Sequence, residues 1–202
     1  MNHKVEDVGL LHDDSKILFN TVVKEEADTI INDLNSAITT LKNSWKGADA
    51  GVQINNVVEV YNGMVEIRNA LAHLAVDSSL VAVNYRDIQR LNNANLDALQ
   101  PVELDMEIPR MEPYSDTKNT IDITTEAVDG RAKLDSTNDS YDDFKTSVDR
   151  QYNAIMDNWQ AGPGRNNADK AFSEFMDNAS KYKQILEDVS KSITTALANY
   201  QL

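Results

Sequence analysis

The sequence has no cysteine, and its 202 residues include only seven glycines and four prolines. Without cysteine there can be no disulfide, no thiolate nucleophile and no cysteine metal ligand, and the redox compartment stays open. So few glycines and prolines argue against a loop-rich or all-β protein. No apolar run approaches the about 18 residues of a membrane span, and the first residues lack the apolar core of a secretory signal. These absences favour a mostly helical protein without membrane insertion.

Basic residues are also scarce, with 19 Lys and Arg against 33 Asp and Glu and a net charge of −14. A surface of this sign repels phosphates. We therefore expect no nucleic acid and no anionic membrane among the partners.

Four stretches place apolar residues at alternating steps of three and four, the spacing of one face of an α-helix. The first two stripes are Ala27, Ile31, Leu34, Ile38, Leu41 and Trp45, then Ile54, Val57, Tyr61, Met64, Leu71 and Leu74. The other two are Tyr141, Phe144, Val148, Tyr152, Ile155 and Trp159, then Ala168, Phe172, Phe175, Ala179, Tyr182, Leu186, Val189, Ile193, Ala196 and Tyr200. Because helical bundles bury such stripes, they predict an all-α fold.

The only two tryptophans, Trp45 and Trp159, each end a stripe just before a glycine-bearing turn. Gly47 is expected to end the first helix and Asp49 to cap the next. In the second copy, Gly162 follows Trp159 with one extra residue between them. We read the chain as one helical hairpin used twice.

This reading gives a tail at 1–12, a hairpin at 13–100, a proline-containing connector at 101–113 and a second hairpin at 114–202. The two antiparallel hairpins in tandem would pack as an elongated four-helix bundle. We expect Asp13, Asp14 or Ser15 to cap the first helix and Ser115-Asp116 to cap the third. The second arm either continues or breaks at 77–79, and the third either continues or breaks at Gly130.

The motif Trp45-Lys46-Gly47 resembles that of the small WXG helical hairpins exported through type VII secretion systems. In that family two antiparallel helices meet at the Trp-x-Gly bend, and two hairpins pair into a four-helix bundle. The resemblance spans nearly the whole chain and is weaker at the second turn, because Trp159-Gln160-Ala161-Gly162 is one residue longer. The family's secretion mark, a tyrosine with an acidic residue four positions later, is not found after either hairpin: Tyr85 precedes Gln89 and Tyr182 precedes Leu186 at that spacing.

No catalytic, cofactor or metal site is predicted. The chain lacks the Glu-x-x-His pairs of di-iron bundles, and its three histidines, His3, His12 and His73, are scattered. Residues 135–146 depart from a calcium loop at Ser140, where glycine is required, and at Thr146, where glutamate is required. The turn at 162–165 is no phosphate loop, because it follows a helix and lacks the Gly-Lys-Ser/Thr ending. We expect a non-enzymatic protein.

The resemblance implies a protein that is secreted, or that escorts a secreted effector, leaving the cytoplasm without a cleaved signal peptide. Its partner would be a helical effector domain or a component of the secretion ATPase, and the hairpins would pair with each other or in a homodimer. The alternative is a structural or adaptor bundle unrelated to secretion. Trp45, Gly47, Trp159 and Gly162 are the expected turn and recognition residues. Each tryptophan is expected to close the end of the bundle as a large apolar cap, to be recognised by the secretion machinery, or both. For recognition, Trp45 would expose one face to a partner, and the stripes would form the core.

Overall fold

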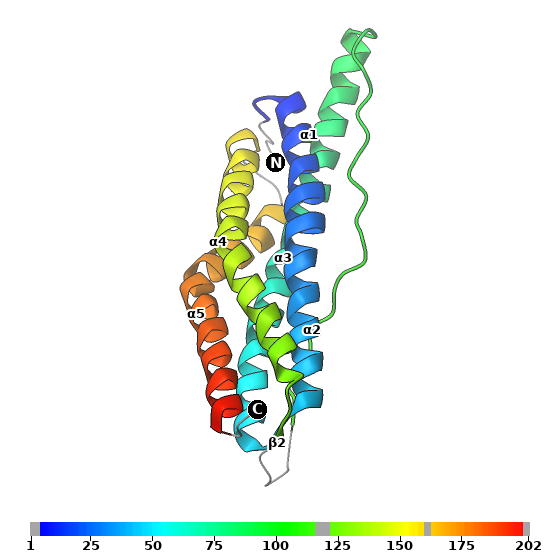
Figure 1. Ribbon diagram of the computed structural model, residues 1–202. Helices are drawn as coiled ribbons and strands as arrows, with labels where there is room; N and C mark the ends of the chain where they lie inside the picture. The colour runs from blue at the N-terminus through cyan, green and yellow to red at the C-terminus, as the bar shows by residue number, and fades with distance from the viewer. Residues whose placement is uncertain (1–4, 116–121, 160–162, 200–202) are drawn as a thin grey trace. The chain divides into compact units, whose positions relative to one another are not determined.

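The computed structural model describes residues 5–115, 122–159 and 163–199, and most of these are helical (Figure 1). The elements in order are α1 (Val8–Ile17), the π-helix η1 (Leu18–Ala27), α2 (Asp28–Ser44), β1 (Trp45–Lys46), α3 (Ala48–Asn92), β2 (Asp122–Ile123), α4 (Ala127–Asn158) and α5 (Pro163–Asn199). The helices pack against one another, so the predicted all-α bundle is confirmed. The only sheet among the described residues is the two-stranded pair of β1 and β2.

The chain divides into two compact units, and each takes one stretch from the beginning, the middle and the end of the sequence. The first unit consists of Met1–Asp28, Ile67–Ile108 and Phe144–Glu174. The second unit consists of Thr29–Glu66, Pro109–Asp143 and Phe175–Leu202. The contacts described below each lie within a single unit.

The first helix begins earlier than the sequence predicted. Asp7, not a residue at 13–15, is the N-cap of α1: its side chain accepts a hydrogen bond of 3.0 Å from the backbone N–H of Leu10. The start shifts because Leu11 and His12 are buried, so the core of the first unit reaches into the predicted tail. Helical structure then continues to Ser44, through the ten-residue π-helix η1.

Helix α3 runs without a break through 77–79, where a new helix cap was one of two expectations. The hydroxyl of Ser78 donates back to the carbonyl of Leu74 at 2.7 Å, a bond that serine makes inside helices. The same hydroxyl lies 2.7 Å from that of Ser15, and both serines are fully buried. Ser78 is therefore an interior contact between α1 and α3 in the first unit.

The start of the third arm was predicted wrongly, whereas at Gly130 a continuous helix was one of two expectations. Helix α4 begins at Ala127, not at 115–116, and Asp116 itself lies outside the described residues. The helix also continues through Gly130. A Cβ at that position would lie 2.9 Å from Cδ2 of Leu41, so the glycine permits α2 to approach closely.

The four predicted stripes do form the core. Of the described stripe residues, all are buried except Phe172 and Ala196, which are half-buried; Tyr200 lies outside the described residues. Tyr141 and Phe175 pack with ring centroids 5.9 Å apart in the second unit, and Tyr152 stacks on Phe172 at 3.9 Å in the first.

Candidate functional site

The first tryptophan turn joins α2 to α3 in the second unit. Helix α2 ends at Ser44, and Gly47 adopts φ 112°, a left-handed conformation that side chains other than glycine's disfavour. The carbonyl of Gly47 then accepts the N–H of Gly51 at 3.0 Å, which opens α3. Asp49 was predicted to cap this helix, but it lies within the first turn, where its negative charge favours the helix dipole.

A short strand pair holds this turn. β1 pairs antiparallel with β2, with Trp45 opposite Ile123 and Lys46 opposite Asp122. The N–H of Thr124 donates to the carbonyl of Ser44 at 2.8 Å and so satisfies an end of α2. The turn is thus fixed by the segment that immediately precedes α4.

The second tryptophan turn has a related arrangement in the first unit. Trp159 follows the end of α4 and forms an isolated antiparallel bridge with Val5, while the N–H of Glu6 donates to the carbonyl of Asn158 at 3.2 Å. Helix α5 begins at Pro163, a residue suited to a first helical position. Gly162, predicted as part of this turn, lies outside the described residues.

Both indoles are interior groups. Trp45 is 3% exposed and Trp159 is 1% exposed. The expectation that Trp45 exposes one face to a partner is therefore wrong, because its apolar surface is buried in the core. Any recognition at this turn must use the surface around the indole.

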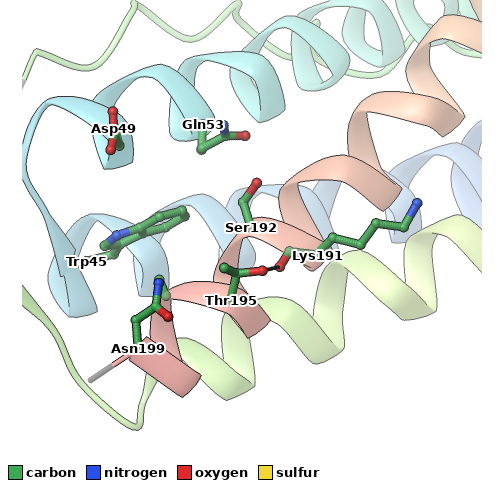
Figure 2. Close-up of a pocket in the computed structure, with 8 residues that line it drawn as sticks. Trp45, Asp49, Gln53, Lys191, Ser192, Thr195 and Asn199 are labelled. Atoms are coloured by element: carbon green, nitrogen blue, oxygen red, sulfur yellow. Dashed lines mark hydrogen bonds between the residues drawn. The ribbon is translucent and has the colours of Figure 1, made fainter. Parts of the chain in front are cut away.

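That surface contains a pocket of about 690 Å³ beside Trp45 (Figure 2). It is lined by Trp45, Asp49 and Gln53 on one side and by Lys191, Ser192, Thr195, Ala196 and Asn199 of α5 on the other. Lys191 lies 3.8 Å from the carboxylates of both Glu187 and Asp188. The lining offers hydrogen-bond donors and acceptors and one charged side chain of each sign, which suits a polypeptide surface better than a small apolar ligand.

Several side chains of the second unit that do not line this pocket have raised pKa values. Hydrogen bonding to Glu59 raises the pKa of Lys181, and hydrogen bonding to Asp142 raises that of Lys183; both lysines are in surface ion pairs. Burial raises the pKa of the Tyr141 hydroxyl. Within 5–115, 122–159 and 163–199, no group of three or more His, Asp or Glu side chains is placed to hold a metal ion.

Sequence reasoning missed a buried ion pair in the first unit. Arg68 is 1% exposed, and its Nε donates to Oδ1 of Asp28 at 2.8 Å, with Asp105 of the connector 3.6 Å from Nη2. The burial of Arg68 could be predicted from its position, because it lies four residues after Met64 and three before Leu71 on the second stripe. Its partners could not be read, because they lie 40 and 37 residues away.

The scan against family models, the search of curated proteins and the search of solved structures each gave no match. No helix in the described part of the chain combines the length and apolarity needed to cross a membrane.

Proposed function

We propose that the protein is a non-enzymatic partner protein of a type VII secretion system, either exported itself or escorting an exported effector. One observation carries the proposal: Trp45-Lys46-Gly47 is the bend between two long helices, with the glycine at positive φ. This is the role that the resemblance to WXG hairpins assigns to those three positions.

The pocket beside Trp45 supplies the contact surface in this proposal. Burial of the indole fixes the bend, and the polar groups of α3 and α5 around it meet the partner. The partner would be a helical domain, because an amphipathic helix can lay its polar edge along Gln53 and Thr195 and its apolar face near Ala196. A net charge of −14 favours a partner with basic residues beside that face.

Export is the direct test. The full chain would be tagged, and culture supernatants compared between cells with an intact secretion ATPase and cells without it. We expect the protein, or an effector that co-purifies with it, in the supernatant only when the ATPase is present. Equal amounts of both in the two supernatants would count decisively against the proposal.

The alternative is a structural or adaptor bundle unrelated to secretion, and the burial of both indoles favours it, since a buried tryptophan needs no partner to explain it. A pull-down from native cells separates the two. Recovery of secretion components or an exported protein supports the first function, whereas a partner set without either supports the second.

A further inference from the structure

Two asparagines of α3 hold the connector by its main chain in the second unit. The amide of Asn62 donates to the carbonyl of Met111 at 3.0 Å and accepts the N–H of Met111 at 2.7 Å. Asn55 does the same with Tyr114, at 2.8 and 2.7 Å. Each asparagine thus uses both its donor and its acceptor on one residue of an extended segment.

The spacing of these contacts follows from backbone geometry. Seven residues of α-helix rise about 10.5 Å, and three residues of extended chain span about 10 Å. Asparagines seven apart therefore meet extended residues three apart. In the first unit, one heptad further along α3, Asn69 makes the same pair of bonds with Ile108, at 2.9 and 3.2 Å.

The segment is held as a ligand is held, by its backbone. Met111 and Tyr114 are half-buried, whereas Glu112 and Pro113 between them and Arg110 before them are exposed. Pro109 and Pro113, which lack an N–H, lie between the residues whose backbone the asparagines bind. An extended segment of suitable spacing would satisfy the two asparagines whatever its exposed side chains are.

Three side-chain contacts add selectivity. Arg110 forms an ion pair with Glu66, and the ammonium of Lys42 lies 5.4 Å from the centroid of the Tyr114 ring, within cation–π range. The sulfur of Met111 lies 3.9 Å from the same ammonium. A cavity of about 390 Å³ continues beside the segment, and Asn55, Asn62, Glu66, Arg110, Pro113 and Tyr182 are among its lining residues.

We infer that this face of α3 is a binding site for an extended polypeptide, which residues 109–115 fill within the chain and which a partner protein can fill in their place. The partner segment carries a basic residue, an apolar residue, any residue, proline and an aromatic residue, in that order. The basic residue meets Glu66, the next two main-chain contacts meet Asn62 and Asn55, and the aromatic ring meets Lys42. The inference does not depend on the secretion role.

The test uses a fluorescent peptide with the sequence of residues 109–115 and full-length chains in which the internal segment is loosened. Arg110→Glu replaces attraction to Glu66 by repulsion but keeps every N–H, and Tyr114→Ala serves if the first variant melts early. We expect either loosened chain to bind the peptide about two- to fivefold more tightly than the unchanged chain, measured by anisotropy.

The asparagines provide the specific readout. In a chain carrying both Arg110→Glu and Tyr114→Ala, whose internal segment competes least, adding Asn62→Ala should weaken peptide binding by about tenfold, since two hydrogen bonds to the peptide are lost. The matched control is Asn56→Ala, the next asparagine along α3, which should leave binding unchanged. In the peptide, Met111→Pro removes the N–H that Asn62 accepts and should bind about tenfold more weakly than Met111→Ala.

Three outcomes overturn the inference. The first is no peptide binding to either loosened chain at millimolar concentration, with both chains folded by circular dichroism. The second is equal binding with and without Asn62. The third is equal binding of the Met111→Pro and Met111→Ala peptides, which would place the peptide somewhere other than on the asparagines.

Discussion

The two tryptophan turns differ in sequence yet have the same local design. In each, the indole is buried, the helix before it has ended, and the tryptophan is bridged to an extended residue just before another helix: Ile123 before α4 in one case, Val5 before α1 in the other. The first has a pair of two-residue strands and a glycine at positive φ, whereas the second has a single bridge and a proline at the start of its next helix.

The two turns share the buried indole and the bridge. The Trp-x-Gly spacing is one of two ways in which the chain passes from the turn into the next helix. The extra residue at the second turn does not cost Trp159 its burial. Differences in function between the turns must then come from what surrounds them, of which the pocket beside Trp45 is the clearest instance.

The largest effect is expected from removing either indole. Trp45→Ala and Trp159→Ala should each lower the free energy of unfolding by about 3–5 kcal/mol, because each leaves a large cavity in a packed core. Thermal or denaturant melts measure this, with Trp→Phe at each position as a milder control. A Trp45→Ala chain that melts near wild type while Trp159→Ala unfolds would break the equivalence.

A smaller loss of stability is expected from changing Gly47, the glycine of the first turn. Gly47→Ala should cost about 1–2 kcal/mol, because alanine at φ 112° places its Cβ against the backbone. Val52→Ala, an exposed change on α3, should alter stability by less than about 0.5 kcal/mol. Equal melting temperatures for the two variants would mean that the turn relaxes to a conformation open to any residue.

The bridges can be compared by deleting one N–H from each. Thr124→Pro removes the 2.8 Å bond to Ser44 and should cost about 1 kcal/mol more than Thr124→Ala, which keeps the N–H. Glu6→Pro removes the 3.2 Å bond to Asn158 and should cost less than Thr124→Pro, each measured against its own alanine variant. The reverse order in chemical denaturation would show that the single bridge is the stronger of the two.

The smallest effect on stability, and the one that tests function, is charge reversal beside each turn. Lys191→Glu at the pocket and Lys170→Glu near the start of α5 alter lysines that are both more than two-thirds exposed, so each should change stability by less than about 0.5 kcal/mol. In a pull-down, Lys191→Glu should reduce partner recovery and Lys170→Glu should not. Equal recovery with both would remove the pocket from the recognition surface.

The helices and the core could be predicted because both depend on the period of the apolar residues. Leu34, Ile54 and Val148 are buried in the structure for the reason that their spacing gave. Helix interruptions were harder to predict, since Gly130 and Ser78 have local preferences that a distant neighbour overrides: Leu41 packs against one and Ser15 bonds the other.

The candidate site was only partly predictable. The motif located the bend at Trp45 and Gly47, but whether an indole at a bend is exposed depends on what packs over it. The heptad spacing of Asn55, Asn62 and Asn69 was visible in the sequence. The sequence does not show what an asparagine side chain will bind. That these asparagines, seven residues apart, bind connector residues three apart could be recognised only from the structure.

Asparagines seven residues apart on α3 bind connector residues three apart. This spacing makes the connector tolerant of substitutions and intolerant of insertions. Substitutions at Glu112 leave both asparagine contacts in place, so this exposed position is free to vary. One residue inserted between Met111 and Tyr114 moves the second contact by about 3.3 Å, beyond hydrogen-bonding reach of Asn55. Over evolution this segment should keep its length while the residue at position 112 varies.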